Sequence, residues 1–403
     1  MPQPFWRRPI YILICASTVI MIAVGIRQSF GLFLKPISLG LGWEFEIFAS
    51  AIAIQNLMIG LGAPFLGAIA DRWGQTRVMA ISGACYAVGV LLISQSTTQG
   101  GMILSAGFLS GLGLAGVGLP LMLAVVGRAA PEEKRSLWLG IVTAGGTAGQ
   151  MVVVPISQGL IDRFGWYAAI LILSGAAAMI VPMVMSMSGA NSAVTSKPSR
   201  QSLGQALAEA THHRGYILLV VGFYVCGLHV QFIATHLPNF LSDSGLDAGI
   251  AATAIAVIGL FNMIGTYTAG YLGGKFRKNY LLSAIYFARS IVILVFFQLP
   301  ISEASVMLFA AAIGLLWLST VPLTGGIVAG LFGTRYMATL YGIVFLSHQL
   351  GSFTGVWLGA VIRDATGAYD IFWWVTVVFG LLAALIHWPI DIRPVARLAE
   401  ESG

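Results

Sequence analysis

Apolar stretches of about twenty residues recur along the whole 403-residue chain, and this feature limits its fold more than any other. Each stretch is long enough to cross a hydrocarbon core of about 30 Å as an α-helix. We expect twelve spans, at residues 10–35, 48–70, 78–96, 101–126, 137–160, 166–188, 215–240, 249–273, 280–299, 304–330, 338–361 and 370–390. Only 9% of the residues are charged, against about 25% in a soluble domain. The predicted fold is an all-α polytopic membrane protein, since a transmembrane β-barrel would show short alternating segments.

The basic residues are distributed unevenly between the segments that join these spans. Sixteen of the 21 lysines and arginines fall on the same side as the N-terminus, and three, Lys35, Arg163 and Arg363, fall on the opposite side. The positive-inside rule then predicts that both termini are cytoplasmic. We expect a multi-pass protein of a bacterial-type inner membrane. Its net charge of +6 follows from this topology and does not indicate a nucleic-acid partner.

A polar stretch at residues 189–214 separates two groups of six spans. We interpret it as a cytoplasmic linker between an N-terminal half, 1–188, and a C-terminal half, 215–403. Its pair of adjacent histidines, His212 and His213, fits a solvated loop better than a metal site. No phosphate-binding loop motif is present, which argues against an ATP-driven pump, and we expect neither cofactor nor metal.

The two halves are related by a constant offset of 202 residues. Equivalent positions carry the same or a similar residue, as in the pairs Gly25 and Gly227, Arg27 and His229, Phe30 and Phe232, Pro120 and Pro322, Gly149 and Gly351, and Gly165 and Gly367. Two parallel six-helix repeats are the architecture of many secondary transporters. The offset places basic groups at the same depth of equivalent helices, and we expect these helices to face each other across a substrate cavity.

Arg27 is a charged residue in the middle of the first apolar span. An unpaired charge there costs roughly 2.5–3.5 kcal/mol even on the lenient insertion scale. No acidic residue falls in the middle of any span, so the expected partner is a substrate anion, which the planar guanidinium binds well. The alternative is a structural arginine that reaches water at the membrane surface. The absence of mid-span carboxylates argues against efflux of cationic drugs.

Eight further residues complete the predicted substrate site: His229, Arg289, His348, Gln349, Asn262, Tyr224, Tyr341 and Phe30. Proton coupling would use His229, His348 or the substrate itself, because the pKa of histidine suits that task. Each residue also has a structural interpretation. Arg289, for example, could support the bundle by reaching Asn262 or a backbone carbonyl, and the aromatic residues could simply pack.

The segment after the second span carries a recognisable motif. It comprises Gly67, Asp71, Arg72, Gly74 and Arg77 in the spacing Gly-x-x-x-Asp-Arg-x-Gly-x-x-Arg. Here the chain resembles the major facilitator superfamily, and the resemblance covers essentially the whole chain. It implies that these residues are gating elements on the cytoplasmic side. Independently of the family, glycine permits close helix approach, and Asp71 can cap a helix end and pair with an arginine.

A narrower resemblance is to bacterial monocarboxylate-transporter-like members and their oxalate/formate-exchanger relatives. It rests on Gly31, Phe33 and Lys35, which follow the basic residue of the first span. The chain departs from that group because span eight lacks the expected arginine and aspartate. Exchangers carry a lysine on span eleven, and the closest candidate here is His348, with Gln349. The exact substrate therefore cannot be transferred.

We predict a secondary active transporter of small organic anions, specifically a proton-coupled monocarboxylate carrier that works by alternating access. Arg27 would bind the carboxylate and His229 would share or relay a proton. The alternatives are an exporter of toxic or hydrophobic compounds, an anion exchanger, and a sensor or scaffold without transport. No nucleophile–base pair indicates an enzyme. The expected partners are the substrate anion, protons and the lipid bilayer, and we expect a monomer.

Overall fold

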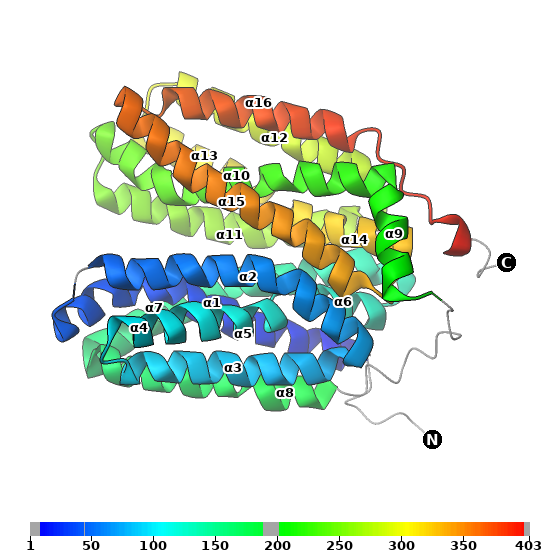
Figure 1. Cartoon of the computed structure of the whole chain (residues 1–403). Helices are drawn as coiled ribbons and strands as arrows, with labels where there is room; N and C mark the ends of the chain where they lie inside the picture. The colour runs from blue at the N-terminus through cyan, green and yellow to red at the C-terminus, as the bar shows by residue number, and fades with distance from the viewer. Residues whose placement is uncertain (1–8, 44, 188–200, 399–403) are drawn as a thin grey trace. The chain divides into compact units, whose positions relative to one another are not determined.

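The computed structural model describes residues 9–43, 45–187 and 201–398, and within these ranges the chain is built from helices without strands (Figure 1). In chain order the helices are α1 (Pro9–Leu41), α2 (Phe45–Trp73), α3 (Gln75–Gln95), α4 (Gln99–Met102), the π-helix η2 (Ile103–Leu109), α5 (Ser110–Val117), α6 (Leu119–Ala129), the 3₁₀-helix η3 (Glu132–Lys134), α7 (Arg135–Ala178), α8 (Ile180–Ser186), α9 (Leu203–His212), α10 (Arg214–Asp243), α11 (Ala248–Leu272), α12 (Lys278–Gln298), α13 (Glu303–Leu316), α14 (Thr320–Phe332), α15 (Met337–Thr366) and α16 (Asp370–His387). The all-α prediction is confirmed.

The described helices fit the twelve predicted spans. Ten stretches are long and apolar enough to cross a membrane, and one of them, Glu132–Ser186, is long enough to cross twice. Its backbone turns at Gly165, whose φ of 78° and ψ of 166° lie outside the helical region. The remaining span is α15, which has 30 residues and therefore the required length.

Two pairs of equivalent residues show the 202-residue repeat in the backbone itself. Gly165 and Gly367 both adopt a positive φ, 78° and 76°, which glycine tolerates without steric cost. Pro120 and Pro322 both follow a helix break, because a proline cannot continue the hydrogen-bond ladder of the preceding turn. The breaks divide the fourth span at Gly118 and the tenth between α13 and α14.

The chain folds into two compact units. Unit 1 comprises residues 1–131, 145–203 and 334–342, and unit 2 comprises residues 132–144, 204–333 and 343–403. Each unit thus includes a short segment from the other half of the sequence: the beginning of α15 in unit 1 and the beginning of α7 in unit 2.

The expected linker differs from a plain loop. Residues 189–200 of this prediction lie outside the described residues, but α9 occupies 203–212. Leu203, Ala206 and Ala210 are buried at helical spacing, which explains why this segment is a helix despite its polar composition.

Glycines bring α10 and α15 into backbone contact within unit 2. A Cβ atom at Gly227 would lie 1.8 Å from the carbonyl oxygen of His348, and one at Gly351 would lie 1.9 Å from that of Tyr224. In unit 1, a Cβ at Gly149 would lie 2.1 Å from the carbonyl oxygen of Met21. Small residues allow this close approach of helices in membrane proteins.

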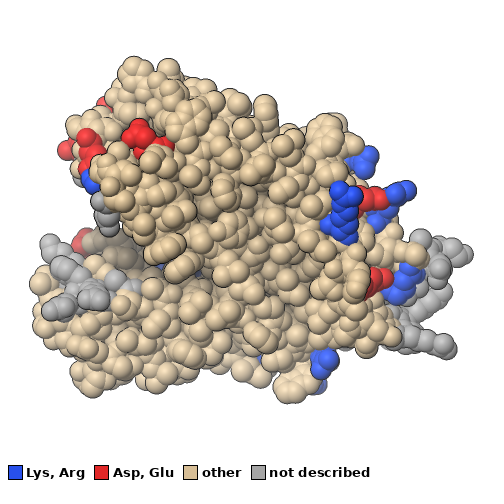
Figure 2. Space-filling model, turned by 45° about the horizontal axis from the view of Figure 1, so that its top comes forward, with Lys and Arg blue, Asp and Glu red and all other residues tan. Residues whose placement is uncertain are grey.

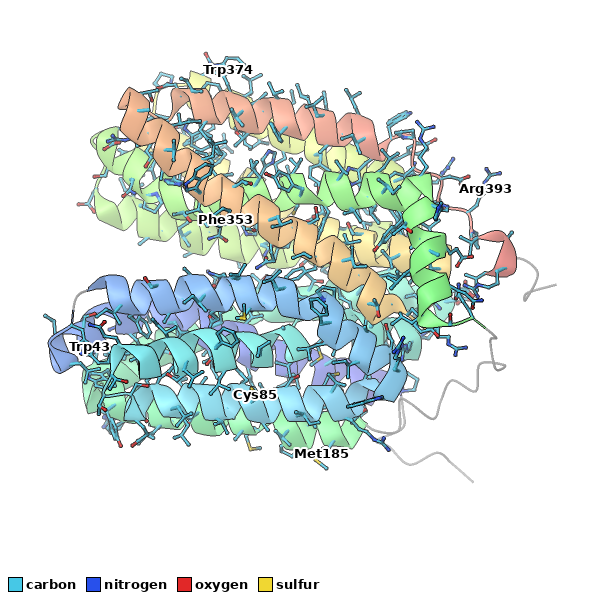
Figure 3. The ribbon with its side chains drawn as sticks, in the orientation of Figure 1. Trp43, Cys85, Met185, Phe353, Trp374 and Arg393 are labelled. Carbon is cyan, nitrogen blue, oxygen red and sulfur yellow. The ribbon has the colours of Figure 1, made fainter. Side chains whose placement is uncertain are left out.

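The surface is largely apolar along the helices. On the face shown in Figure 2, most charged side chains lie toward the ends of the helices, and a broad uncharged surface lies between. Large apolar side chains are exposed along α16, where Leu385 is 70% exposed. Trp374 projects outward from the same helix (Figure 3). This surface suits hydrocarbon and would be unfavourable in water.

Candidate functional site

Arg27 lies on α1 in unit 1 and contacts a neutral partner. Its Nη2 donates a hydrogen bond to Oδ1 of Asn56 on α2, and both side chains are half-buried. Tyr86 of α3 lies nearby and donates from its hydroxyl to the carbonyl oxygen of Ala23 at 3.2 Å. Among the described residues no carboxylate pairs with Arg27. The positive charge of the guanidinium is therefore not neutralised by a described protein carboxylate.

The other predicted site residues of unit 1 are aromatic and buried. Phe30 is on α1, one helical turn beyond Arg27, and belongs to the core of the unit. Tyr341 comes from the α15 segment of unit 1 and is also fully buried. A polar pair lies on the next residue of α1, where Gln28 donates to Oε1 of Gln150 at 3.4 Å. The described neighbours of Arg27 in this unit are therefore an amide, Asn56, and a phenol, Tyr86.

Arg289 and Asn262 both form hydrogen bonds with the backbone where the helix breaks between α13 and α14 in unit 2. The Nη2 atom of Arg289 donates to the carbonyl oxygen of Leu316 and, at 2.7 Å, to that of Trp317. Oδ1 of Asn262 accepts the backbone N–H of Leu318 at 3.0 Å. The last carbonyls of a helix have no partners within it and attract cations. These bonds agree with the structural interpretation of Arg289, whose side chain is 1% exposed. They engage Nη2, while Nε is buried without a hydrogen-bond partner among the described residues.

A buried polar cluster forms around the thiol of Cys226. Nη1 of Arg289 approaches its sulfur at 3.8 Å, and the hydroxyl of Thr320 lies 3.2 Å from it. His348 on α15 also lies beside the thiol. The Nδ1 atom of His348 is 3.2 Å from Oε1 of Gln349. The structure thus brings together three predicted site residues, Arg289, His348 and Gln349, and adds two that the sequence did not single out.

His229 is enclosed by helices of unit 2. Its Nε2 donates to the carbonyl oxygen of Thr376 on α16 at 2.8 Å, and the side chain has no exposed surface. A Cβ atom at Gly380 would lie 2.9 Å from the imidazole ring, so α16 packs directly against it. The 202-residue offset predicted the depth of His229 but not this direction. Tyr224, the remaining candidate, shares a hydrogen bond with Thr354 of α15.

The predicted gating motif is centred on Asp71, at the end of α2 in unit 1. Its Oδ1 accepts a hydrogen bond from Nη2 of Arg128 at 2.6 Å, and its carboxylate has no exposed surface. Its Oδ2 accepts from the backbone N–H of Thr339 at 2.8 Å and from the Thr339 hydroxyl at 2.7 Å. The aspartate therefore caps the first turn of α15 and pairs with an arginine, as the sequence suggested.

The motif glycines have distinct physical roles. Gly74 joins α2 to α3 with a φ of 97°, which a residue with a side chain would adopt only with strain. A Cβ at Gly67 would lie 2.6 Å from the carbonyl oxygen of Ala338, so this glycine lets α2 pack on the start of α15. Arg72 and Arg77 are exposed, and the ion pair forms instead with Arg128, which lies outside the motif.

Sequence reasoning missed Cys226, Thr320 and Arg128. The repeated spacing of Pro120 and Pro322 was a signal for Thr320 alone, since Thr320 begins the half-helix that contains the second proline. No group of three or more His, Cys, Asp or Glu side chains within the described ranges is arranged to hold a metal ion.

A cation within an apolar helix, discontinuous helices and a capped motif on a repeated six-helix plan are features of a membrane carrier. Comparison with known proteins agrees. The chain belongs to the Major Facilitator Superfamily, whose family model matches residues 13–356. It is therefore a multi-pass membrane transporter and not an enzyme.

Several known proteins are similar to the chain over most of their lengths. The uncharacterized MFS-type transporter YcxA of Bacillus subtilis is 25% identical over 378 residues, which cover 90% of each chain. Monocarboxylate transporter 13 of Rattus norvegicus is 26% identical over 384 residues, which cover 90% of this chain and 85% of the relative. Among solved structures, the E. coli fucose:proton symporter FucP superposes with a TM-score of 0.69 at 16% identity, covering 94% of this chain and 97% of FucP. The proton:xylose symporter XylE superposes with a TM-score of 0.74 at 13% identity, covering 94% and 95%. At such identities these structures establish the fold alone.

Proposed function

We propose that this transporter carries a small monocarboxylate together with protons by alternating access. The observation that carries the proposal is the pairing of Arg27 with Asn56, a neutral amide. A charge inside the membrane needs a partner of opposite sign. A substrate carboxylate would supply that charge through a bidentate pair with the guanidinium. The identity of about 25% to monocarboxylate transporters supports the same substrate class.

The pairing of Arg289 favours one negative charge on the substrate. The Nη2 atom of Arg289 donates to the carbonyl oxygens of Leu316 and Trp317, so we assign this guanidinium to the helix break and not to a second carboxylate. This leaves Arg27 as the cation of the proposed site. In unit 2, His348 and Gln349 form a separate polar group.

His348 suits proton transfer better than His229. The imidazole of His229 has no exposed surface, and its Nε2 is held by the carbonyl of Thr376. His348 is also buried, at 8% exposed, but its ring adjoins the polar side chains of Gln349 and Cys226, and no backbone group of the described residues holds it. Proton exchange requires access to water or substrate, and histidine is the side chain that most readily accepts and releases a proton in the physiological range.

The contacts of Asp71 would act as the gate. They join the end of α2 to the first turn of α15 inside unit 1, so breaking them would free α15 to move. The uneven distribution of lysine and arginine supports a cytoplasmic position for this end and for both termini, in a bacterial-type inner membrane.

The test is uptake of labelled monocarboxylates into proteoliposomes under an imposed proton gradient, with a dicarboxylate, an amine and a neutral solute as comparisons. We compare Arg27→Gln with Asn56→Asp, which leaves the arginine in place but gives it a protein carboxylate. Asn56→Leu is the matched control, because it has a similar shape and adds no charge.

We expect Arg27→Gln and Asn56→Asp to abolish monocarboxylate uptake, and Asn56→Leu to retain part of it. Neutralising the cation from within the protein removes the reason for an anion to bind. Wild-type uptake by Asn56→Asp would show that Arg27 does not bind the substrate charge and would overturn the proposal. Uptake of the amine alone would show that the protein carries cationic compounds, as the exporter alternative requires.

A further inference from the structure

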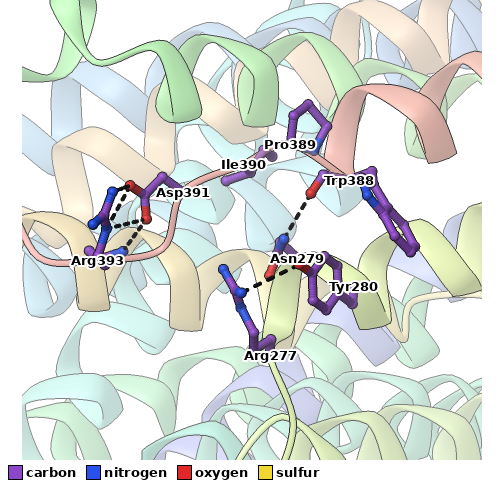
Figure 4. A pocket seen from close by; sticks show the side chains of 8 residues that line it. All are labelled: Arg277, Asn279, Tyr280, Trp388, Pro389, Ile390, Asp391 and Arg393. Carbon is purple, nitrogen blue, oxygen red and sulfur yellow. Dashed lines mark hydrogen bonds and ion pairs between the residues drawn. The ribbon is translucent and has the colours of Figure 1, made fainter.

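A pocket of about 470 Å³ lies at the end of unit 2 where α16 ends and α12 begins (Figure 4). Its lining combines two arginines, two aromatic rings, one amide and one carboxylate, from Arg277, Arg393, Tyr280, Trp388, Asn279 and Asp391. The proposed transport site uses none of these residues. They therefore need a separate explanation.

Arg277 supplies the uncompensated charge of this pocket. Its guanidinium carbon lies 4.8 Å from the ring centroid of Tyr280, and Nη1 is 3.4 Å from the Tyr280 hydroxyl. No carboxylate forms an ion pair with it among the described residues. Arg393 differs, because it pairs with Asp391 through contacts that include Nε to Oδ2 at 2.8 Å. The pocket thus contains one ion pair and a second cation, Arg277, which lies outside that pair and whose charge also acts on Asp391.

The pocket continues into a surface built for hydrocarbon. Helices α12 and α16 pack side by side. Their outer faces expose apolar residues such as Phe287 and Leu385. At the end of these faces the rings of Tyr280 and Trp388 lie 4.8 Å apart, and Trp388 is 61% exposed. Tyrosine and tryptophan gather where a membrane protein meets the lipid headgroups. Figure 3 shows Trp374 toward the opposite end of α16 and Arg393 beyond this end.

Asn279 fixes the end of α16 at the wall of the pocket. Its Nδ2 donates to the carbonyl oxygen of Trp388 at 3.0 Å, which fixes the orientation of the amide. Its Oδ1 is buried at the pocket wall and accepts no hydrogen bond from any described residue. A buried acceptor without a donor is unfavourable. With less than 1 Å² of accessible surface, Oδ1 is closed to a ligand in the pocket, so Asn279 shapes the pocket wall and takes no part in recognition.

We propose that this pocket binds the headgroup of an anionic phospholipid, with its phosphate on Arg277 and its acyl chains along the seam between α12 and α16. Basic pockets at the surface of transmembrane helices are known to hold such headgroups. The charge, the aromatic rings and the apolar seam occur together in the order that a lipid presents them: phosphate, glycerol region and hydrocarbon. Phosphatidylglycerol, whose only charge is the negative charge of its phosphate, is the probe for this class of lipid.

The experiment is native mass spectrometry of the purified full chain, delipidated and then given equal amounts of phosphatidylglycerol and phosphatidylcholine with identical acyl chains. We compare wild type with Arg277→Gln. The matched control is Arg163→Gln, because Arg163 is also exposed beside an aromatic ring, at 5.8 Å from the centroid of Phe164, but lies outside the pocket. Glycerol phosphate, which lacks acyl chains, is offered in a separate sample.

We expect wild type and Arg163→Gln to retain phosphatidylglycerol in preference to phosphatidylcholine, and Arg277→Gln to lose about five- to tenfold of that preference, the effect of about one surface charge. Equal retention of the two lipids by wild type would overturn the proposal, whatever the folding of the variant. So would unchanged preference in Arg277→Gln. Binding of glycerol phosphate as tight as that of the lipid would assign the pocket to a soluble phosphate compound instead.

Discussion

The guanidinium of Arg289 donates to the carbonyl oxygen of Trp317 at 2.7 Å, in the gap between the end of α13 and the start of α14. A helix that breaks inside a membrane leaves carbonyl groups without water to satisfy them. Arg289 fills that need, and Asn262 does the same for the N–H of Leu318. A buried charge here therefore stabilises a discontinuous helix.

Replacing Arg289 should consequently affect folding before binding. We expect Arg289→Met to lower the free energy of unfolding by about 1–3 kcal/mol, because two carbonyls lose their donor. Thermal unfolding in detergent measures the loss, and anion affinity of the folded fraction should be unchanged. A variant as stable as wild type that no longer binds the anion would show that Arg289 contacts substrate.

A substitution at Gly351 tests the close backbone contact between α10 and α15. A methyl group there would lie 1.9 Å from the carbonyl oxygen of Tyr224, and a backbone atom cannot move aside cheaply. We expect Gly351→Ala to destabilise the protein by about 1–3 kcal/mol. Gly330→Ala is the control, because a methyl group at Gly330 would have no atom within 4 Å and alanine favours a helix. Equal melting temperatures for both variants would contradict this packing.

The Asp71–Arg128 pair should be energetically coupled. A double-mutant cycle with Asp71→Asn and Arg128→Gln is expected to give a coupling of about 0.5–3 kcal/mol, because the carboxylate is fully buried. The cycle for Asp243 and Arg363, whose side chains are 47% and 35% exposed, should give less than about 1 kcal/mol. Unfolding in detergent measures both cycles, and a reversed order would remove the physical basis for the proposed gate.

The pKa of Asp391 indicates how lipid binding in the pocket should respond to pH. Hydrogen bonds from Arg393 lower the pKa of this exposed carboxyl to about 2. Because this pKa is below the unfolded value of about 3.9, the ionised Asp391 stabilises the folded protein fully above about pH 4. This stabilisation is lost as the pH falls toward about 2. Preference for phosphatidylglycerol should therefore be constant between about pH 5 and 8.

Asp391→Asn should increase that preference, since it releases Arg393 to the phosphate. The measurement is lipid retention by native mass spectrometry. A decrease in this variant would mean that the carboxylate takes part in binding.

The sequence predicted the features that depend on hydropathy and on backbone geometry. Twelve spans follow from the length of the apolar runs, and the repeat follows from residues such as Gly165 and Gly367, whose positive φ makes glycine necessary. The capping role of Asp71 was also accessible, because an aspartate at a helix end has few alternatives. These properties are local, so the sequence carries them directly.

Side-chain direction was harder to predict. The offset assigned His229 the depth of Arg27, yet its ring is directed at Thr376, because the packing of α16 decides which side of α10 it occupies. The partner of Arg289 could not be named either. The carbonyls of Leu316 and Trp317 become available only where the helix breaks, and Pro322 indicates a break without locating it.

The composition of unit 1 has a consequence for biosynthesis. Because this unit contains residues 334–342, it lacks a part until the ribosome has passed residue 342, late in translation. Until then the carboxylate of Asp71 has no Thr339 to accept from. An N-terminal fragment that stops before α15 would therefore emerge with this carboxylate partly unsatisfied, and adding the missing segment in trans should restore it.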